Sequence, residues 1–248
     1  MAERRDKELH AASFDSVAGV YDAARPSYPA RAVDWLVPSD ATRIADIGAG
    51  TGKFTRLLQS PGRDVVAIDP SPHMLQVVRD TLPGVDAREG TAEHIPLADS
   101  SVDAVTFAQA WHWVDVAPAS AEVARVLVPG GTLGLLWNLR DERVDWVREL
   151  GIAMHADGDQ FTDDVGTPNV AEPFEAPENA QFAWSASYTR DGILDLVRSR
   201  SYFAVMSAPE QEETLTAVSA LLDSHPETRD RESFDFPYIT VCFRYRRP

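Results

Sequence analysis

A glycine-rich run early in the chain combines residue types that favour close approach of a ligand. Asp46-Ile47-Gly48-Ala49-Gly50-Thr51-Gly52 lies where a β-branched segment gives way to an amphipathic one. Glycines there let the main chain turn tightly and let a ligand lie against the backbone. A phosphate-binding loop is excluded because Phe54, and not Ser or Thr, follows Gly52-Lys53. A dinucleotide fingerprint is weakened but stays open, because Lys53 stands where its third glycine is expected.

A second acidic residue, Asp69, ends the next apolar segment. A carboxylate in that position can accept hydrogen bonds from both hydroxyls of a ribose, or it can cap the helix that starts near Pro70-Ser71-Pro72. Two later motifs stand at matching intervals, Glu89-Gly90-Thr91-Ala92-Glu93 and Leu127-Val128-Pro129-Gly130-Gly131. This ordered set resembles the class I S-adenosylmethionine-dependent methyltransferases with a type 11 methyltransferase domain, strongly over about residues 10 to 140 and weakly beyond.

The resemblance implies S-adenosylmethionine as the cofactor and S-adenosylhomocysteine as its product. That cofactor carries a sulfonium and a zwitterionic methionine end, so its site needs carboxylate and carbonyl acceptors and no phosphate clamp. Residues in the family's cofactor-contacting positions are Asp46, Gly48, Ala49, Gly50, Gly52, Asp69, Pro70, Met74, Thr91, Ala92, Glu93, Ala108 and Gln109.

Aromatic and cationic residues gather on segments that we expect at the carboxyl edge of a parallel sheet, where such folds bind ligands. The expected acceptor-binding residues are Tyr21, Arg25, Tyr28, Trp111, His112, Trp113, Trp137, Asn138, Arg200 and Tyr202. The Arg25-Pro26-Ser27-Tyr28-Pro29 segment and the run from Gln109 to Trp113 are similar to a subgroup that includes trans-aconitate and related small-molecule methyltransferases. This implies a small polar acceptor, O-methylation, and in part of the subgroup a carboxylate, which arginine recognises well.

His112 is the histidine placed to take part in catalysis. Its ordinary pKa near 6.5 suits proton transfer near neutrality, so it is a candidate for orienting or deprotonating an acceptor hydroxyl. The alternative is a histidine packed between Trp111 and Trp113 and bonded to the backbone. A carboxylate acceptor would need no base, because its nucleophilic oxygen is already ionised.

The elements that must position these residues follow a βα alternation from Arg43 to Trp137. Expected strands are 43–48, 64–69, 85–89, 102–109, 132–138, 181–189 and 236–247, with helices at 53–60, 71–79, 118–127 (ended by Pro129-Gly130-Gly131), 189–201 and 209–223. This predicts an α/β fold, which the resemblance makes Rossmann-like, with seven mostly parallel strands, an antiparallel last strand and a helical lid or cap. Residues 1–40 are expected as an N-terminal lid and 41–248 as the methyltransferase domain, with a cap insertion at about 140–225.

The composition and charge of the chain limit the classes of partner that it can bind. The formal net charge is −16, which disfavours nucleic acid and anionic membranes, and no apolar run is long enough to span a bilayer. The charged N-terminus lacks a secretory pattern, so a cytoplasmic protein is expected. The expected assembly is a monomer or a homodimer. No metal site is expected, because the histidines and acidic runs lack ligand spacing. The single cysteine, Cys242, is expected as a half-buried strand thiol.

Two other functions stay open. One is a catalytically inactive protein that keeps the S-adenosylmethionine pocket, which would show cofactor affinity without product. The other is an NAD-dependent oxidoreductase on a related doubly wound fold, which would bind NAD in preference to S-adenosylmethionine.

Overall fold

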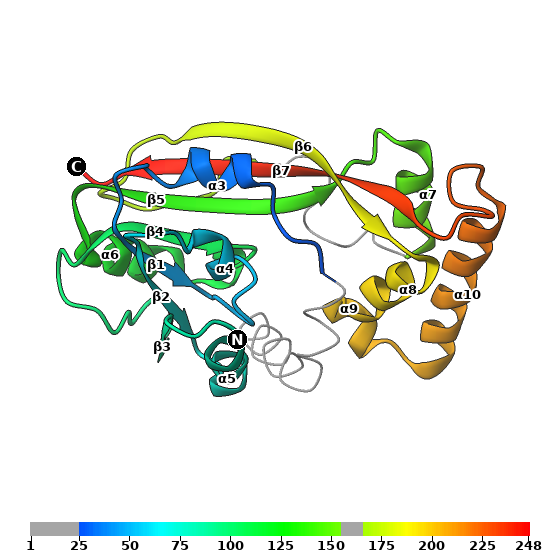
Figure 1. Cartoon of the computed structure of the whole chain (residues 1–248), viewed down its shortest axis with the longest axis horizontal. Helices are drawn as coiled ribbons and strands as arrows, with labels where there is room; N and C mark the ends of the chain where they lie inside the picture. The colour runs from blue at the N-terminus through cyan, green and yellow to red at the C-terminus, as the bar shows by residue number, and fades with distance from the viewer. Residues whose placement is uncertain (1–24, 155–165) are drawn as a thin grey trace. The chain divides into compact units, whose positions relative to one another are not determined.

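The computed structural model describes residues 25–154 and 166–248, which fall into two compact units (Figure 1). Of the described residues, the first unit comprises 25–26, 139–154 and Ala183–Ile239, and the second comprises Ser27–Asn138, Gly166–Phe182 and Thr240–Pro248. Of the predicted acceptor residues, Tyr21 lies outside the described part of the chain. Within that part, no helix has both the length and the apolar character needed to cross a membrane.

The described residues form one seven-stranded sheet in the order β3-β2-β1-β4-β5-β7-β6. The strands are β1 (Arg43–Ile47), β2 (Asp64–Asp69), β3 (Asp86–Glu89), β4 (Val102–Ala108), β5 (Leu127–Arg140), β6 (Glu178–Tyr188) and β7 (Phe234–Arg246). Pairs β3-β2, β2-β1, β1-β4 and β4-β5 are parallel. The order turns back between β1 and β4, and an open parallel sheet binds its ligand where the strand order reverses.

The last strand runs against its neighbour. Gly130 N–H donates to the Arg247 carbonyl and Arg247 N–H donates to the Gly131 carbonyl, whereas Asp141 N–H near the far end of β5 reaches Pro237. Rising numbers on β5 therefore meet falling numbers on β7, as the opposed arrows in Figure 1 show. The predicted seven-stranded, mostly parallel sheet with an antiparallel last strand is confirmed.

The helices of the second unit are α3 (Ala30–Leu36), α4 (Thr55–Leu58), α5 (Pro72–Thr81) and α6 (Val116–Val126), with a 3₁₀ turn at Trp111–Trp113. Pro72 occupies the first turn of α5, and the Ser71 hydroxyl accepts from Met74 N–H, so the predicted cap is present. α6 ends at Val126, before the Pro129-Gly130-Gly131 turn that we expected to end it. Those residues belong instead to β5, because Gly130 and Gly131 pair with Arg247.

α3 is part of the segment expected as a lid, and its inner face is fixed in the core. Ala32, Val33 and Leu36 pack with Ile44 of β1 and other buried residues of the second unit. A Cβ built on Gly134 of β5 would lie 2.5 Å from Leu36 Cγ, so the helix sits directly on the sheet backbone. Residues 1–24 of the expected lid lie outside the described part of the chain.

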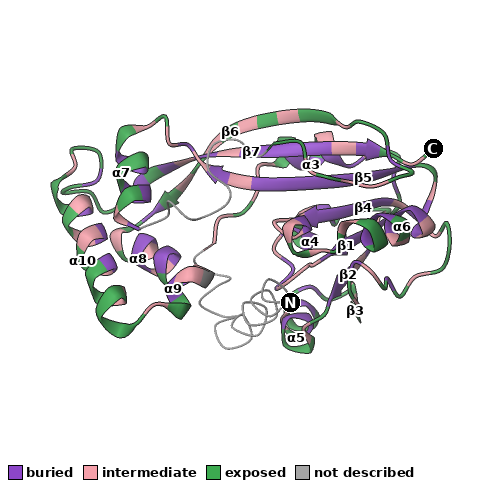
Figure 2. Ribbon diagram, turned by 180° about the vertical axis from the view of Figure 1, so that it is seen from behind, coloured by how far each residue is buried: buried purple, intermediate pink, exposed green. Residues whose placement is uncertain are grey.

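The first unit contains α7 (Asp145–Ala153), α8 (Arg190–Arg198), α9 (Ser201–Val205) and α10 (Ala208–Ser224). α7 and α8 are buried along one side, drawn in purple in Figure 2. These sides pack with strand residues of the same unit into one core, for example Trp146 of α7 against Phe234 and Phe236 of β7. α7 was missing from the sequence-based expectation, although its Trp146, Val147 and Leu150 have helical spacing.

Cys242 lies on β7 and is fully buried, not half-buried as expected. Burial raises the pKa of its thiol to about 12. It packs among core residues of the second unit, so it is a small apolar filler there.

Candidate functional site

The predicted glycine turn follows β1, and its three glycines all adopt left-handed backbone, with φ of 66° at Gly48, 54° at Gly50 and 83° at Gly52. Gly48 and Gly52 are crowded: an added Cβ would lie 2.7 Å from Ala110 Cβ at the first and 2.8 Å from Leu82 Cδ1 at the second. Gly50 faces open space, with no atom within 4 Å of an added Cβ. The turn therefore packs on both sides and leaves its middle open for a ligand.

Asp69, at the end of β2, is held next to this opening. One carboxylate oxygen accepts from Gly50 N–H at 2.8 Å and the other from Ser71 N–H at 2.9 Å. These bonds fix the carboxylate beside the turn, and carboxylate oxygens are the kind of acceptor that ribose hydroxyls need. Asp69 thus braces the start of the α5 segment through Ser71, which is one of the two roles that the sequence left open, and it also contacts the middle glycine.

Asp46 is almost completely buried, with 1% of its surface exposed. Its two oxygens accept hydroxyl hydrogen bonds, from Thr55 at 2.6 Å and from Thr106 at 2.9 Å. Burial raises the pKa of Asp46 to about 6, against the lowering effect of these hydroxyls. The carboxylate links β1 to β4 and to the start of α4, so it holds together the elements on either side of the glycine turn. The sequence analysis missed both threonines; a hydroxyl within the apolar strand β4 is the signal that could have found Thr106.

The loop after β3 carries the residues expected near the adenine. Thr91 is exposed, Ala92 is buried, and Thr91 pairs with His94 in a short bridge that closes the loop. Glu93 accepts from Asp115 N–H at 2.8 Å, which ties this loop to the start of α6. Met74 on α5 is 5% exposed and packs as a core residue.

Gln109, just after β4, also has a left-handed backbone, with φ of 57°. Its N–H donates to the Leu136 carbonyl at 2.9 Å, and its side-chain amide donates to the Asn138 carbonyl at 3.1 Å. These bonds lock the ends of β4 and β5 together. Ala108 and Gln109 are partly exposed. They lie beside the glycine turn, since the next residue, Ala110, packs against Gly48.

The aromatic run after Gln109 forms a tight turn in which each ring has a different role. Trp111 is buried and donates its indole N–H to the Asn169 carbonyl at 2.9 Å. Trp137 donates its indole N–H to His112 Nδ1 at 3.4 Å, and the rings of His112 and Trp113 lie 4.7 Å apart. Trp113 is 40% exposed. His112 is therefore oriented by the fully buried indole of Trp137 and is not simply sandwiched.

Asn138 links three segments through its side chain. Its amide donates to the Ser27 carbonyl at 2.8 Å, and its carbonyl oxygen accepts from the Thr240 hydroxyl at 2.6 Å. Tyr28 packs edge-on against Phe54, with ring centroids 5.1 Å apart. These two predicted acceptor residues therefore connect the segment before α3 to β5, β7 and Phe54 of the same unit.

The predicted acceptor residues fall into two sets. Tyr28, Trp111, His112, Trp113, Trp137 and Asn138 belong to the second unit, whereas Arg25, Arg200 and Tyr202 belong to the first. In the first unit, Arg25 donates from Nη2 to the Ser199 carbonyl at 3.1 Å, immediately before Arg200. Each set therefore belongs to a single unit.

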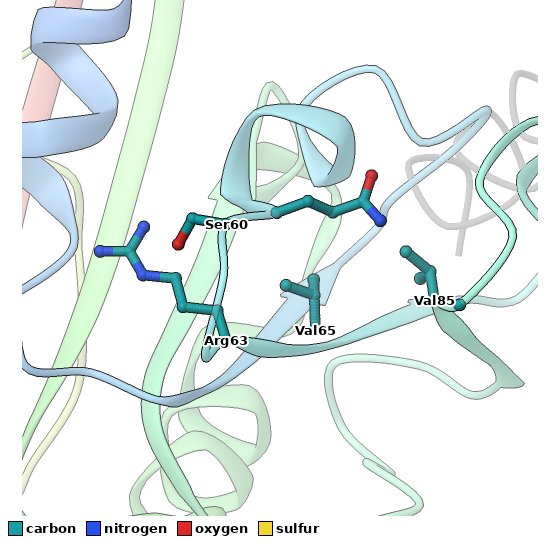
Figure 3. Close-up of a pocket in the computed structure, with 6 residues that line it drawn as sticks. Ser60, Arg63, Val65 and Val85 are labelled. Atoms are coloured by element: carbon teal, nitrogen blue, oxygen red, sulfur yellow. The ribbon is translucent and has the colours of Figure 1, made fainter.

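A surface pocket of the second unit lies near the amino ends of the parallel strands, whereas the glycine turn follows the carboxyl end of β1 (Figure 3). It is lined by Gln59, Ser60, Arg63, Val65, Gly84 and Val85. Val65 stands near the amino end of β2, whereas Asp69 ends that strand, so this pocket is separate from the glycine turn. Among the residues that the structure describes, no group of three or more His, Cys, Asp or Glu side chains could hold a metal ion.

The residues around the glycine turn fit S-adenosylmethionine in their donor and acceptor chemistry. The open face of Gly50 gives the nucleoside a flat approach to the backbone, and the Asp69 carboxylate beside it supplies acceptors for the ribose hydroxyls. The crowding at Gly48 and Gly52 keeps the turn in the shape that leaves this face open.

Comparisons with known proteins identify the family. A family model described as a methyltransferase domain matches residues 45–135. An uncharacterised methyltransferase of Mycobacterium tuberculosis is 52% identical over 241 residues, which cover 97% of each chain. A malonyl-[acyl-carrier protein] O-methyltransferase of Pectobacterium atrosepticum is 33% identical over 137 residues, or 54% of each chain.

The fold agrees as well. A solved structure from Anaeromyxobacter dehalogenans, assigned to the type II methyltransferases, superposes with a TM-score of 0.59 at 24% identity, over 90% of this chain and 96% of that one. The chain therefore belongs to the class I S-adenosylmethionine-dependent methyltransferases, and S-adenosylmethionine is its cofactor.

Proposed function

We propose that this methyltransferase acts on an oxygen atom of a small polar organic molecule. The observation that carries this is the contact of Ala110 with Gly48, since a Cβ on that glycine would lie 2.7 Å from Ala110 Cβ. The turn Trp111–Trp113 follows Ala110 directly and contains His112, so an aromatic surface with one imidazole stands beside the cofactor turn. Such a surface suits a small acceptor with one group to be oriented.

His112 acts in this proposal as a hydrogen-bond donor. Because the Trp137 indole N–H donates to Nδ1, the neutral imidazole carries its proton on Nε2. Nε2–H can then bond to the acceptor oxygen and hold it in place, but it has no lone pair with which to take a proton. Of the roles that the sequence left open for His112, orientation of the acceptor has the support of this contact.

The mechanism needs little beyond placement. S-adenosylmethionine supplies an electrophilic methyl group on a sulfonium. The chain's part is to hold the acceptor oxygen in line with that methyl group and to keep water away, which aromatic side chains such as Trp113 favour. An ionised carboxylate oxygen would react without a base, which agrees with a donating His112. The name of the Pectobacterium relative also describes an O-methyltransferase.

The proposal is tested by product formation. The purified chain would be incubated with S-adenosylmethionine carrying a trideuterated methyl group and a panel of small hydroxy acids, di- and tricarboxylic acids, phenols and amines. We expect mass spectrometry to find labelled methyl esters or ethers. Labelled amines alone would contradict the assignment to oxygen, and cofactor binding without any labelled product would favour an inactive binding protein.

Two variants of His112 test its role. His112→Gln keeps a side-chain N–H donor and should retain turnover within about tenfold, whereas His112→Phe should lose about a hundredfold. A general base would give a different pattern. Both variants would then lose a hundredfold or more, and the wild-type rate would fall as the pH drops and the imidazole becomes protonated. The affinity for S-adenosylmethionine, measured by calorimetry, is the control and should stay within twofold.

A further inference from the structure

The first unit contains a cluster of arginine and tyrosine side chains that the cofactor site does not use. Arg140 ends β5, Tyr238 lies on the neighbouring strand β7, and Tyr188 ends β6 on the far side of β7. Asp141 N–H donates to the Pro237 carbonyl at 3.0 Å, so Arg140 and Tyr238 stand at adjacent positions across two strands.

Aromatic packing holds the two tyrosines in place. Phe236 contacts both rings, with its centroid 5.7 Å from Tyr188 and 4.7 Å from Tyr238. Trp184 stacks on the other side of Tyr238 at 5.4 Å. Tyr238 is 2% exposed, so its ring is fixed inside the unit.

Two more arginines join from the segments next to α8. Arg25 donates to the Ser199 carbonyl, and Arg200 is the next residue along the chain. Burial raises the pKa of Tyr188, and the nearby charges of Arg200 and Arg25 act in the lowering direction. The pKa of Tyr238 is also raised by burial, against Arg200 and Arg140. Both hydroxyls therefore stay protonated at neutral pH, among three guanidinium groups.

Among the described residues, Arg140 and Arg200 together have one acidic partner. Arg140 has one acidic partner, Glu142 at 3.2 Å, while among the described residues Arg200 forms no ion pair. The Nε–H groups of Arg140 and Arg200 are buried and make no hydrogen bond to the described protein atoms. Buried donors of this kind are normally satisfied, so their presence in two arginines whose charges both act on Tyr238 indicates a missing acceptor.

We propose that Arg140, Arg200 and Tyr238 form a binding site for a compact oxyanion, a carboxylate or a phosphate carried by a small molecule. The planar guanidinium groups match the paired oxygens of such an anion, and the neutral tyrosine hydroxyl adds a further donor. That this anion belongs to the methyl acceptor rests on the proposed function. The site itself rests only on residues of the first unit.

The test is direct binding to the full chain. Inorganic phosphate and succinate would be titrated in separate calorimetric experiments at low ionic strength, up to about 20 mM, a range that detects millimolar affinity. We expect at least one to bind, and the tighter of the two identifies the chemistry. Arg200→Gln should weaken that binding about tenfold or more, because it removes charge-assisted hydrogen bonds. Arg200→Lys keeps the charge but not the fork, and it should fall in between.

Arg198→Gln is the matched control. Arg198 belongs to the same unit, is 45% exposed at its side chain and pairs with Asp195 at 2.8 Å on the surface. Its loss should leave anion binding within twofold. Arg200→Gln and Arg200→Lys that bind both anions as tightly as the wild type would overturn the site, as would a wild type that binds neither.

These outcomes separate the site from the proposed function. Affinity for S-adenosylmethionine should be unchanged in Arg200→Gln, since that residue lies outside the unit with the glycine turn. Anion binding that depends on Arg200, in a chain that methylates no oxygen acceptor, would leave the anion site standing while the proposed function fails. Oxygen methylation with no effect of Arg200 on anion binding would do the reverse.

Discussion

Gly48, Gly50 and Gly52 share a left-handed backbone but differ in what surrounds them. The outer two are needed because Ala110 and Leu82 leave no room for a Cβ. At Gly50 the surroundings are open, so the space there is available to a ligand. Glycine at this position therefore serves binding more than packing, and the two contributions can be measured separately.

Gly50→Ala should bind S-adenosylmethionine at least tenfold more weakly, because its methyl group occupies the open face of the turn. The positive φ of 54° costs about 1 kcal/mol of stability. Gly62→Ala is the control, since Gly62 has φ of 83° and open surroundings but lies before β2, away from the turn. It should lose similar stability and no affinity in calorimetry; equal affinity in the two variants would refute the cradle at Gly50.

The buried carboxylate of Asp46 gives stability a pH dependence. Its pKa of about 6 in the folded chain lies above the ordinary 3.8, so the unfolded chain releases this proton first. The contribution is fully present below pH 3.8 and is lost as the pH rises through about 6. Charged Asp46 therefore destabilises the folded chain at neutral pH, by up to about 3 kcal/mol for a shift of this size.

Asp46→Asn should raise the free energy of unfolding at pH 7.5 by about 1 to 3 kcal/mol and should raise it less at pH 5. The carbonyl oxygen of Asn can still accept from one of the two threonine hydroxyls. Urea denaturation at both pH values is the measurement, with the exposed Asp40 changed to Asn as the control. A variant that is less stable than the wild type at pH 7.5 would mean that the charged form is the favoured one.

At the scale of elements, the contact of α3 with β5 decides how the second unit closes on one side. Leu36 lies over Gly134, where even a methyl group would meet its side chain at 2.5 to 3.0 Å. The fit is therefore a close packing of a helix against bare strand backbone.

Gly134→Ala should destabilise the chain by about 1 to 3 kcal/mol through overpacking, and Leu36→Ala by about 2 to 5 kcal/mol through a cavity. Combined, they should cost less than their sum, because the new methyl group fills part of the cavity. Gly166→Ala, at an open position without positive φ, is the neutral control. Strict additivity in urea denaturation would show that Leu36 and Gly134 do not share this contact.

The strands and the cofactor turn were predictable because their signals are local. The glycine spacing from Gly48 to Gly52 and the apolar run of β4 are complete within a few residues. The helix expected over 53–60 is the shorter Thr55–Leu58 in the structure. α6 ends at Val126, and Gly130 and Gly131 belong to a strand because they pair with Arg247. That pairing joins residues more than a hundred positions apart, which no local pattern records.

The same limit applied to the side chains of the sites. Thr106 meets Asp46 only because β1 and β4 are neighbours, and Tyr238 meets Arg140 only through the order β5-β7-β6. Arg25 and Arg200 were predicted from residue type, but their unit became visible only with the fold. Sequence patterns thus identified the glycines and the acidic residues of the turn, and strand order supplied the residues that support them.

At the scale of the whole molecule, the two units carry different sites. The glycine turn with Asp69 and His112 belongs to the second unit, and the arginine and tyrosine cluster belongs to the first. Three strands, β5, β6 and β7, continue from one unit into the other along the chain. Because the two sites belong to different units, the response of each unit to an added ligand can be measured separately.

Hydrogen exchange with S-adenosylmethionine should show this separation. We expect the greatest added protection in peptides covering Gly48–Gly52, the end of β2 and Gln109, because binding orders backbone that the free turn exposes. Peptides from α10 are the internal reference. Protection that is greatest in α10 and missing from the glycine turn would place the cofactor elsewhere.

The position of Cys242 has a practical consequence. It is the single cysteine of the sequence, and its thiol is buried with a pKa of about 12. A thiolate must add to the double bond of a maleimide, so the native chain should stay unlabelled while a cysteine engineered on the surface reacts. Fluorophores can therefore be attached at a chosen point without first removing Cys242, and slow labelling of the unaltered chain becomes a clock for transient opening around β7.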